Sequence, residues 1–461
     1  MKRLLVITLL LGCAGAQHAA RSTPVPGPAA APAQAPRAPP APQIAAETGA
    51  SGTVGSRTPL GTSAPDANAP APAPGTGAPG ATAARPAAPP PVAFVSAVAA
   101  FEENRLDEAK QLFDSVPESD PYRAAARYNL GVIAERQGDL PSAERAYREA
   151  LSVLPDYPRA LLNLSRILRV QGKAAEALPL YESALQRPGR SGDPALLNGL
   201  AAAQRSAGQR EQAEATARRV LARSRDDAEA YRTLALCALD QGNPRLAELY
   251  ALTARKRAGK DASIANTLGL IYLKLDERPR ALAELQRALA LDPSFAPAHL
   301  NLGALALSSR DYATAEKSFS RALALEPWSK DAALFRAWAL DGLRAQDPRR
   351  GPEAGAAFEK VLAFQPGDPE ATCGAGFGYA ADKASYDRAL PFLEKCLELG
   401  GTSQERQAAE ARLKTIQAVL AAAAAQKKEP QPGEGEVESK GEVQGSGGSG
   451  QAEDGSSVPP Q

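Results

Sequence analysis

A small residue recurs at a nearly constant spacing through about two thirds of this chain. Six of the eight steps between neighbouring copies are 34 residues long and the other two are 36 and 39, for the series Ala97, Gly131, Ser165, Ala201, Ala235, Gly269, Gly303, Ala337 and Gly376. A fixed period of this length is typical of a solenoid, in which each unit packs only against its neighbours. Solenoids present extended surfaces, so we infer function from the surface residues and from the way the chain is anchored.

Each repeat carries the signals of two helices joined by a short turn. Asn243 with Pro244 has the pattern of a helix N-cap followed by proline at the first helical position. In the copy from 262 to 295, a second small residue, Ala281, opens the second half, and Pro293 ends it. Two helices that cross closely need small residues at the crossing, and proline cannot continue a helix. Each repeat is therefore predicted to be a helical hairpin.

This pattern resembles the tetratricopeptide repeat, which has small residues at positions 8, 20 and 27 and proline at position 32 of each unit. The resemblance implies an all-α fold, a tetratricopeptide-repeat α-solenoid in which about nine helical hairpins form a superhelix over residues 90–403. Residues 404–428 read as one helix with an apolar stripe, which we expect to cap the last hairpin. The copy from 330 carries five extra residues around 346–351, and these predict a longer surface loop between its helices.

The first residues resemble a bacterial lipoprotein signal peptide. Two basic residues precede an apolar run over residues 4–11, which is far shorter than the ~20 residues of a membrane-spanning helix. The sequence Leu-Leu-Gly-Cys that ends at Cys13 resembles a lipobox, in which the cysteine is acylated and becomes the mature N-terminus. Residues 1–12 are therefore expected to be removed and Cys13 to be lipidated. An ordinary secretory signal with a chance cysteine is the alternative.

The anchor and the flanking segments suggest where the repeats are held. Acyl chains on Cys13 would anchor the protein without a transmembrane helix. Ala14 stands where an aspartate would retain many bacterial lipoproteins in the inner membrane, so the resemblance implies the outer membrane, with the repeats facing the periplasm. Residues 13–89 are rich in Ala and Pro and are predicted to be a disordered tether. Residues 429–461 are predicted to be a disordered, acidic, Gly/Ser-rich tail; from residue 427 onward the net charge is −4, with three lysines and seven acids.

Composition argues against several classes of function. The net charge of +1 lacks the basic excess that an obligatory nucleic-acid partner requires. The two histidines and four cysteines show no zinc-like spacing. The glycine-rich segment at 374–378 follows no strand, so it does not fit a dinucleotide-binding loop. We therefore expect no metal, no cofactor, no small-molecule substrate and no enzymatic activity.

Two cysteines leave a structural question open. Cys373 and Cys396 fall on opposite helices of one predicted hairpin, and in an oxidising compartment they could form a disulfide. Cys396 also stands where a small buried residue is usual, so a reduced core cysteine is equally compatible with the sequence. Cys237 is expected to be a lone buried thiol.

Candidate binding residues follow from the resemblance, because the first helix of each tetratricopeptide hairpin lines the concave groove. Arginines able to pair with carboxylates in a fork geometry occupy groove positions of the earlier copies, namely Arg159, Arg166, Arg169, Arg205 and Arg232. Asparagines that could bond the main chain of an extended peptide recur at position 6, namely Asn129, Asn163 and Asn301. Apolar anchors are expected in the later copies, namely Leu334, Trp338 and Phe377.

Each of these assignments has a structural alternative. Arginines populate every solvated face of an Ala/Arg-rich chain, the asparagines could be small polar fillers, and the aromatic residues could pack between helices. The acidic tail could also occupy the basic half of the groove.

The sequence thus favours a non-catalytic scaffold that binds a segment of another envelope protein, with the acidic part of that segment over the first half of the groove. Lipoproteins of this build resemble outer-membrane components of the myxobacterial gliding motility apparatus, which is our preferred hypothesis, and pilotins of type IV pili. An assembly factor for pili, the outer membrane or the cell wall is the alternative. A glycan-processing enzyme would need a carboxylate pair or a nucleotide-binding domain outside the repeats, and neither is visible in the sequence.

Overall fold

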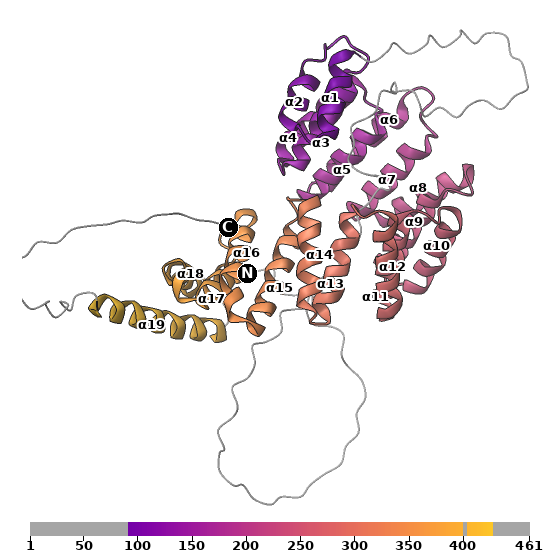
Figure 1. Cartoon of the computed structure of the whole chain (residues 1–461). Helices are drawn as coiled ribbons and strands as arrows, with labels where there is room; N and C mark the ends of the chain where they lie inside the picture. Colours follow the sequence, from indigo (N-terminus) through magenta and orange to yellow (C-terminus); the bar gives the residue numbers. More distant parts are fainter. Residues whose placement is uncertain (1–90, 400–402, 427–461) are drawn as a thin grey trace, which may run out of the picture. The chain divides into compact units, whose positions relative to one another are not determined.

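The computed structural model describes residues 91–399 and 403–426, and within them the chain forms nineteen α-helices, three 3₁₀ helices and no strand. The α-helices are shown in Figure 1 and are α1 Val92–Glu102, α2 Leu106–Asp114, α3 Arg123–Arg136, α4 Leu140–Val153, α5 Pro158–Val170, α6 Leu178–Gln186, α7 Pro194–Ser206, α8 Arg210–Arg223, α9 Ala228–Asp240, α10 Pro244–Arg257, α11 Ala262–Lys274, α12 Arg278–Leu291, α13 Ala296–Ser308, α14 Tyr312–Leu325, α15 Lys330–Gln346, α16 Gly351–Phe364, α17 Pro369–Tyr379, α18 Tyr386–Leu399 and α19 Ser403–Gln426.

The first eighteen α-helices form nine hairpins. In eight of them the two helices pack side by side, whereas in the third hairpin α5 packs mainly against the 3₁₀ turn Ala174–Ala177 that leads into α6. The second helix of each hairpin also contacts the first helix of the next one (Figure 1). The last helix, α19, packs against α17 and α18, and its Ala409 and Ile416 are buried there. The all-α solenoid of nine hairpins with a terminal helix is therefore confirmed. The predicted signal peptide, tether and acidic tail lie outside the described residues.

The recurring small residue marks the crossing of the two helices of a hairpin. A Cβ atom added to Gly303 would lie 2.6 Å from Cε1 of Phe319, and one added to Gly131 would lie 2.5 Å from Cε1 of Tyr147. Both distances are shorter than real carbon contacts, so the bulky side chain occupies the space that a side chain on the first helix would need. The spacing of these residues in the sequence therefore reflects one packing contact repeated along the solenoid.

The turns between the helices follow the sequence signals. Gly138 has a backbone φ of +80°, a conformation that costs a residue with a Cβ atom free energy. The side chain of Asp139 accepts a hydrogen bond from the backbone N–H of Ser142, and Asn243 accepts one from that of Leu246. These are N-caps that satisfy backbone donors at the start of the second helix.

The prediction of a longer surface loop around residues 346–351 was wrong. The insertion lengthens α15 to 17 residues, against 13 in α13, and is followed by a 3₁₀ helix over Pro348–Arg350. Four added residues make about one helical turn. The added turn is packed, because Leu343 is buried and a Cβ atom on Gly342 would lie 2.4 Å from the ring of Tyr312.

The last hairpin is cross-linked. Cys373 on α17 and Cys396 on α18 form a disulfide, so the structure decides between the two states that the sequence left open. Both cysteines are buried, in a cluster that includes Ala409 and Ile416 of α19. The third described cysteine, Cys237, is a buried free thiol, as expected.

We expect Gly303→Ala to lower the free energy of unfolding by about 1–3 kcal/mol, because the new Cβ atom would collide with the ring of Phe319. The matched control is Gly259→Ala, where the added Cβ atom meets only the Arg255 carbonyl at 3.4 Å. Urea unfolding followed by circular dichroism measures both. Equal stability of the two variants would contradict the crossing contact.

Reduction of the disulfide is expected to lower the free energy of unfolding of the last hairpin by about 3 kcal/mol, because it closes a loop with a sequence separation of 23 residues. Thermal melts with and without dithiothreitol measure this effect. The double variant Cys373→Ser/Cys396→Ser should melt at one temperature in both conditions. An equal melting temperature of the wild type with and without dithiothreitol would show that the disulfide does not stabilise the fold.

Candidate partner-binding surface

Arg166 lies at the centre of a polar cluster on the first helices of the second and third hairpins. Its guanidinium pairs with the carboxylate of Glu135 on α3, and its Nη1 lies 3.4 Å from Oε1 of Glu326, which follows α14. The Glu135 side chain is 1% exposed and that of Arg166 is 21% exposed. Burial alone would lower the pKa of Arg166, but the two carboxylates outweigh it and raise that pKa above its usual value.

Hydrogen bonds extend this cluster to neighbouring helices. The hydroxyl of Tyr147 donates to Oε1 of Glu135 at 3.0 Å. Nδ2 of Asn163 donates to the hydroxyls of Tyr147 and Tyr128 at 3.1 and 3.3 Å. Burial, followed by the negative charge of Glu135, raises the pKa of Tyr147 well above its usual value, so this hydroxyl stays protonated and keeps donating. Asn163 is thus bound within the protein and holds two tyrosines in place.

The turn that follows α14 closes over this cluster. Trp328 is 7% exposed, and its ring centroid lies 5.2 Å from the guanidinium carbon of Arg166. A Cβ atom at Gly138 would lie 3.6 Å from Cβ of Pro327. The turn therefore contacts both α5 and the turn between α3 and α4, and residues 160 positions apart in the sequence meet here.

Arg169 lies one helical turn beyond Arg166 on α5 and is less well paired. Its Nε atom is buried and has no hydrogen-bond acceptor among the residues that the structure describes. Burial, together with the like charges of Arg166 and Arg205, lowers the pKa of Arg169 to about 10, against the opposing pull of Glu326 and Asp331. The side chain therefore stays cationic at neutral pH.

Two other predicted groove arginines are held by acids of the chain itself. Arg205 forms a bidentate pair with Asp240, at 2.6 Å from Nε and 3.1 Å from Nη2, and its side chain is 8% exposed. Arg232 forms a bidentate pair with Glu229 and is fully buried. Burial removes Arg232 from the accessible surface in this conformation. Arg159 is exposed and acts on Tyr128 only through its charge.

The asparagine row and the apolar anchors are largely packed inside. Asn129 and Asn301 are fully buried, and Asn301 donates to Oδ1 of Asn266 at 3.0 Å. Trp338 is 8% exposed and lies 5.3 Å from the ring of Phe335. The other two predicted apolar anchors, Leu334 and Phe377, are half-buried. Leu334 packs in the same hydrophobic cluster as Trp338, whereas Phe377 packs in the cluster that contains the disulfide. The structure does not bring the apolar candidates together into one site.

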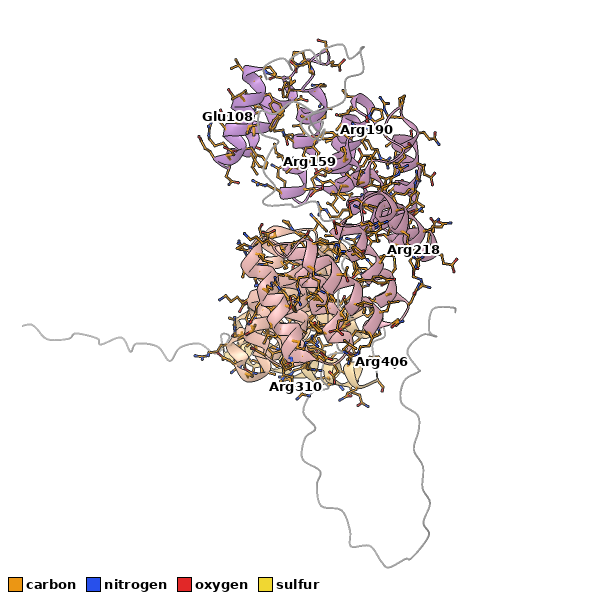
Figure 2. The ribbon with its side chains drawn as sticks, turned by 90° about the vertical axis from the view of Figure 1, so that its right-hand side faces the viewer. Glu108, Arg159, Arg190, Arg218, Arg310 and Arg406 are labelled. Atoms are coloured by element: carbon orange, nitrogen blue, oxygen red, sulfur yellow. A yellow bond between two sulfur atoms is a disulfide. The ribbon has the colours of Figure 1, made fainter. Side chains whose placement is uncertain are left out.

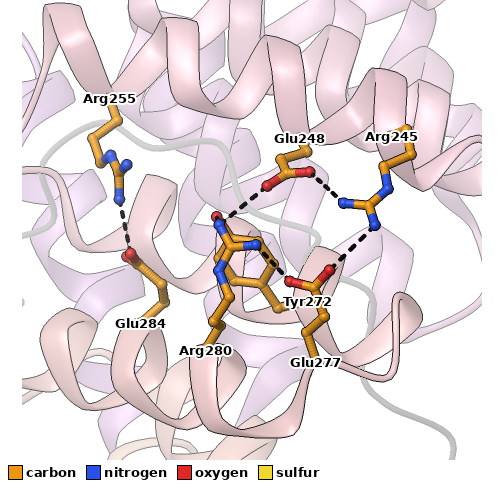
Figure 3. Close-up of polar contacts among 7 residues, drawn as sticks. All are labelled: Arg245, Glu248, Arg255, Tyr272, Glu277, Arg280 and Glu284. Atoms are coloured by element: carbon orange, nitrogen blue, oxygen red, sulfur yellow. Dashed lines mark hydrogen bonds and ion pairs between the residues drawn. The ribbon is translucent and has the colours of Figure 1, made fainter.

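Second helices carry a different kind of arginine pairing, shown in Figure 3. Arg280 of α12 lies 3.2 Å from Glu248 of α10 and 2.5 Å from Glu277, and Arg245 of α10 lies 3.3 Å from Glu277. The Arg280 guanidinium also donates to the hydroxyl of Tyr272 at 2.6 Å. These cations are compensated across neighbouring repeats at an exposed surface, where single ion pairs contribute little stability.

Sequence reasoning missed three residues that shape this surface. Glu135 occupies a groove position, and mapping acids together with arginines on the first helices would have found it. Glu326 and Trp328 stand in a turn between repeats, where no local pattern indicates a contact with α5. Within the described ranges no group of His, Cys, Asp or Glu could hold a metal ion, and no helix there is long and apolar enough to cross a membrane.

Comparison with known proteins agrees with the repeat pattern. Family models described as tetratricopeptide repeat match residues 94–152, 136–194, 170–237 and 266–327. The chain is 43% identical over 65 residues to tetratricopeptide repeat protein 8 of Caenorhabditis elegans, which covers 14% of this chain and 13% of that protein. It spans less than a quarter of the length of each curated relative that it matches, at 13%, 23% and 10%.

Parts of the chain are also similar to solved structures. The hetero-tetramer Cut9-Hcn1 of the APC/C matches at 16% identity with a TM-score of 0.43, over 68% of this chain and 60% of that one. PilF of Pseudomonas aeruginosa matches at 21% identity with a TM-score of 0.41, over 48% of this chain and 99% of that one. Together with the family models, the nine hairpins confirm that the chain contains tetratricopeptide repeats.

We expect Arg166→Met to lower the free energy of unfolding by about 3 kcal/mol, because it leaves the buried carboxylate of Glu135 without its counter-charge. The matched control is Arg218→Met, since Arg218 points outward in Figure 2 and its side chain is 60% exposed. That control should change stability by less than about 0.5 kcal/mol. Urea unfolding measures both, and the double variant Arg166→Met/Glu135→Gln should recover part of the loss. Wild-type stability of Arg166→Met would contradict the cluster.

Proposed function

We propose that this chain of tetratricopeptide repeats is a non-catalytic protein-interaction scaffold, lipid-anchored in the outer membrane through Cys13 and facing the periplasm. The observation that carries the scaffold function is the stack of nine helical hairpins, because solenoids of this kind use their long surface to bind other proteins. The under-paired guanidinium of Arg169 marks the part of that surface best suited to an acidic partner segment.

Two features support the proposed location. The first thirteen residues have the basic, apolar and cysteine elements of a lipoprotein signal. The disulfide between Cys373 and Cys396 suits a compartment outside the reducing cytosol, because structural disulfides persist in oxidising surroundings such as the periplasm.

The finer proposal concerns the machine that the scaffold serves. We favour the gliding motility apparatus, on the resemblance of an outer-membrane tetratricopeptide lipoprotein with a long Ala/Pro tether to components of that apparatus. A pilotin or assembly factor for type IV pili, the outer membrane or the cell wall has the same build and would differ in its partner. Identification of the co-purified protein therefore separates these possibilities.

Affinity purification of the full chain from its own envelope, followed by mass spectrometry, tests the scaffold. We expect one envelope complex to be recovered, with motility proteins if the favoured assignment holds and with pilus, barrel or cell-wall proteins if the alternative holds. Recovery of no partner from cross-linked membranes would overturn the scaffold function.

We expect Cys13→Ala to move the protein from the membrane fraction to the soluble fraction and to abolish incorporation of labelled palmitate, because the acylated thiol is lost. The matched control is Cys237→Ala, which removes a buried cysteine inside the repeats and should leave both readouts unchanged. Membrane fractionation and palmitate labelling measure them. If the Cys13 variant stays membrane-bound and labelled, the lipid anchor is not at this residue.

A further inference from the structure

Arg166 and Arg169 are three residues apart on α5, so their side chains lie on the same side of the helix. Arg166 is bound on one side by Glu135, which belongs to the neighbouring hairpin. On its other side it is bound by Glu326, which directly follows α14 at the end of the seventh hairpin, four hairpins further along the chain. The second carboxylate is thus not part of the local repeat packing.

The carboxylate of Glu326 interacts with two cations, Arg166 and Arg169. Glu326 lies 3.4 Å from Nη1 of Arg166, longer than the 2.7–2.9 Å typical of a charge-assisted hydrogen bond. Its negative charge also acts on Arg169, yet no hydrogen bond joins them among those described. Arg205, the third cation nearby, is already engaged by Asp240. The chain's own carboxylate therefore satisfies this pair of arginines only in part.

Two N–H donors near this turn have no acceptors among the described residues. These are Nε of Arg169 and Nε1 of Trp328, and both atoms are buried. Trp328 covers Arg166 with its ring, and Pro327 lies against the turn at Gly138. Buried donors that lack acceptors disfavour the conformation that creates them. The Glu326 ion pair that helps to hold the turn over Arg166 is thus a contact that an external carboxylate could replace.

We propose that the turn Glu326–Trp328 is an internal plug on an acidic-peptide site formed by Arg166 and Arg169, and that a partner's acidic segment binds there by displacing Glu326. This inference rests on the proposed scaffold function and names the chemistry of its partner. The incoming carboxylates pair with the forked guanidiniums of both arginines, and the turn moves off α5. A segment with one acid competes poorly, because the internal Glu326 is always present at the site.

Binding of a fluorescein-labelled hexaglutamate peptide, followed by anisotropy at low salt, tests the plug. The protein is the full chain carrying Cys13→Ala, and hexaglutamine is the uncharged control peptide. We expect Glu326→Gln to tighten hexaglutamate binding about five- to tenfold, since the competitor is lost. The matched control is Glu277→Gln, the same charge change in the network of Figure 3, and it should leave the affinity within about twofold of wild type. We expect Arg169→Gln to weaken binding about tenfold.

A second experiment fixes the turn Glu326–Trp328 in its docked position with an engineered disulfide. The 3.6 Å separation between a Cβ atom at Gly138 and Cβ of Pro327 lies within the range that a disulfide bridges. The variant Gly138→Cys/Pro327→Cys should lose hexaglutamate binding when oxidised and regain it on reduction. Gly138→Cys alone carries the same backbone strain, so it is the matched control and should bind in both conditions.

Several outcomes would overturn the plug. Equal affinities for Glu326→Gln and Glu277→Gln would show that the turn is no competitor. If neutralising five of the seven tail acids, Glu429, Glu434, Glu436, Glu438 and Glu442, to Gln tightens binding and Glu326→Gln does not, the chain's own tail is the occupant. If no variant binds hexaglutamate while the envelope complex still co-purifies, this inference fails and the scaffold function stands. Loss of every co-purified partner would instead count against the scaffold.

Discussion

One packing contact is repeated along the whole structure. In each case a bulky side chain on the second helix of a hairpin packs on a small residue of the first helix. Tyr147 on Gly131 and Phe319 on Gly303 are its clearest cases. Because this crossing fixes how closely two helices approach, it also fixes the face that each hairpin offers to the next one. Stacking then needs only short-range contacts, and the solenoid grows by addition of like units.

The turn after α14 departs from that nearest-neighbour arrangement. Glu326 and Trp328 reach Arg166, so hairpins far apart in the sequence share a half-buried ion pair and a cation–π contact. Such a contact stabilises one curvature of the repeat stack over others, because it forms only when both ends meet. The same contact places Glu326 and Trp328 against Arg166, which links the conformation of the solenoid to the availability of this arginine for partners.

Arginines in this chain thus fall into groups that composition cannot separate. Those on second helices, such as Arg245 and Arg280, belong to exposed networks that keep the surface soluble and contribute little energy each. Arg205 and Arg232 are fixed by bidentate acids within the helix stack. Arg169 alone of the predicted groove arginines combines a buried donor without an acceptor and two like-charged neighbours among the described residues. Recognition of acidic segments would accordingly depend on very few side chains.

The sequence by itself determined the fold class and the number of hairpins, because both depend on local signals that recur every 34 residues in most steps. It also determined the terminal helix, because the apolar stripe of that helix is a local pattern. The sequence also identified which residues lie on the first helices of the hairpins. The lipoprotein signal that it contains stays a prediction. The sequence analysis missed the longer α15 because it considered only the number of inserted residues, which suggested a loop. The inserted residues in fact continue the helix, and Leu343 lies on its buried face. Tertiary structure decided the rest. The partners of Arg166 stand 31 and 160 residues away, and burial of Arg232 and Asn301 depends on packing between hairpins. Periodicity fixes a local backbone, but pairing and burial depend on distances in space that no short stretch of sequence encodes.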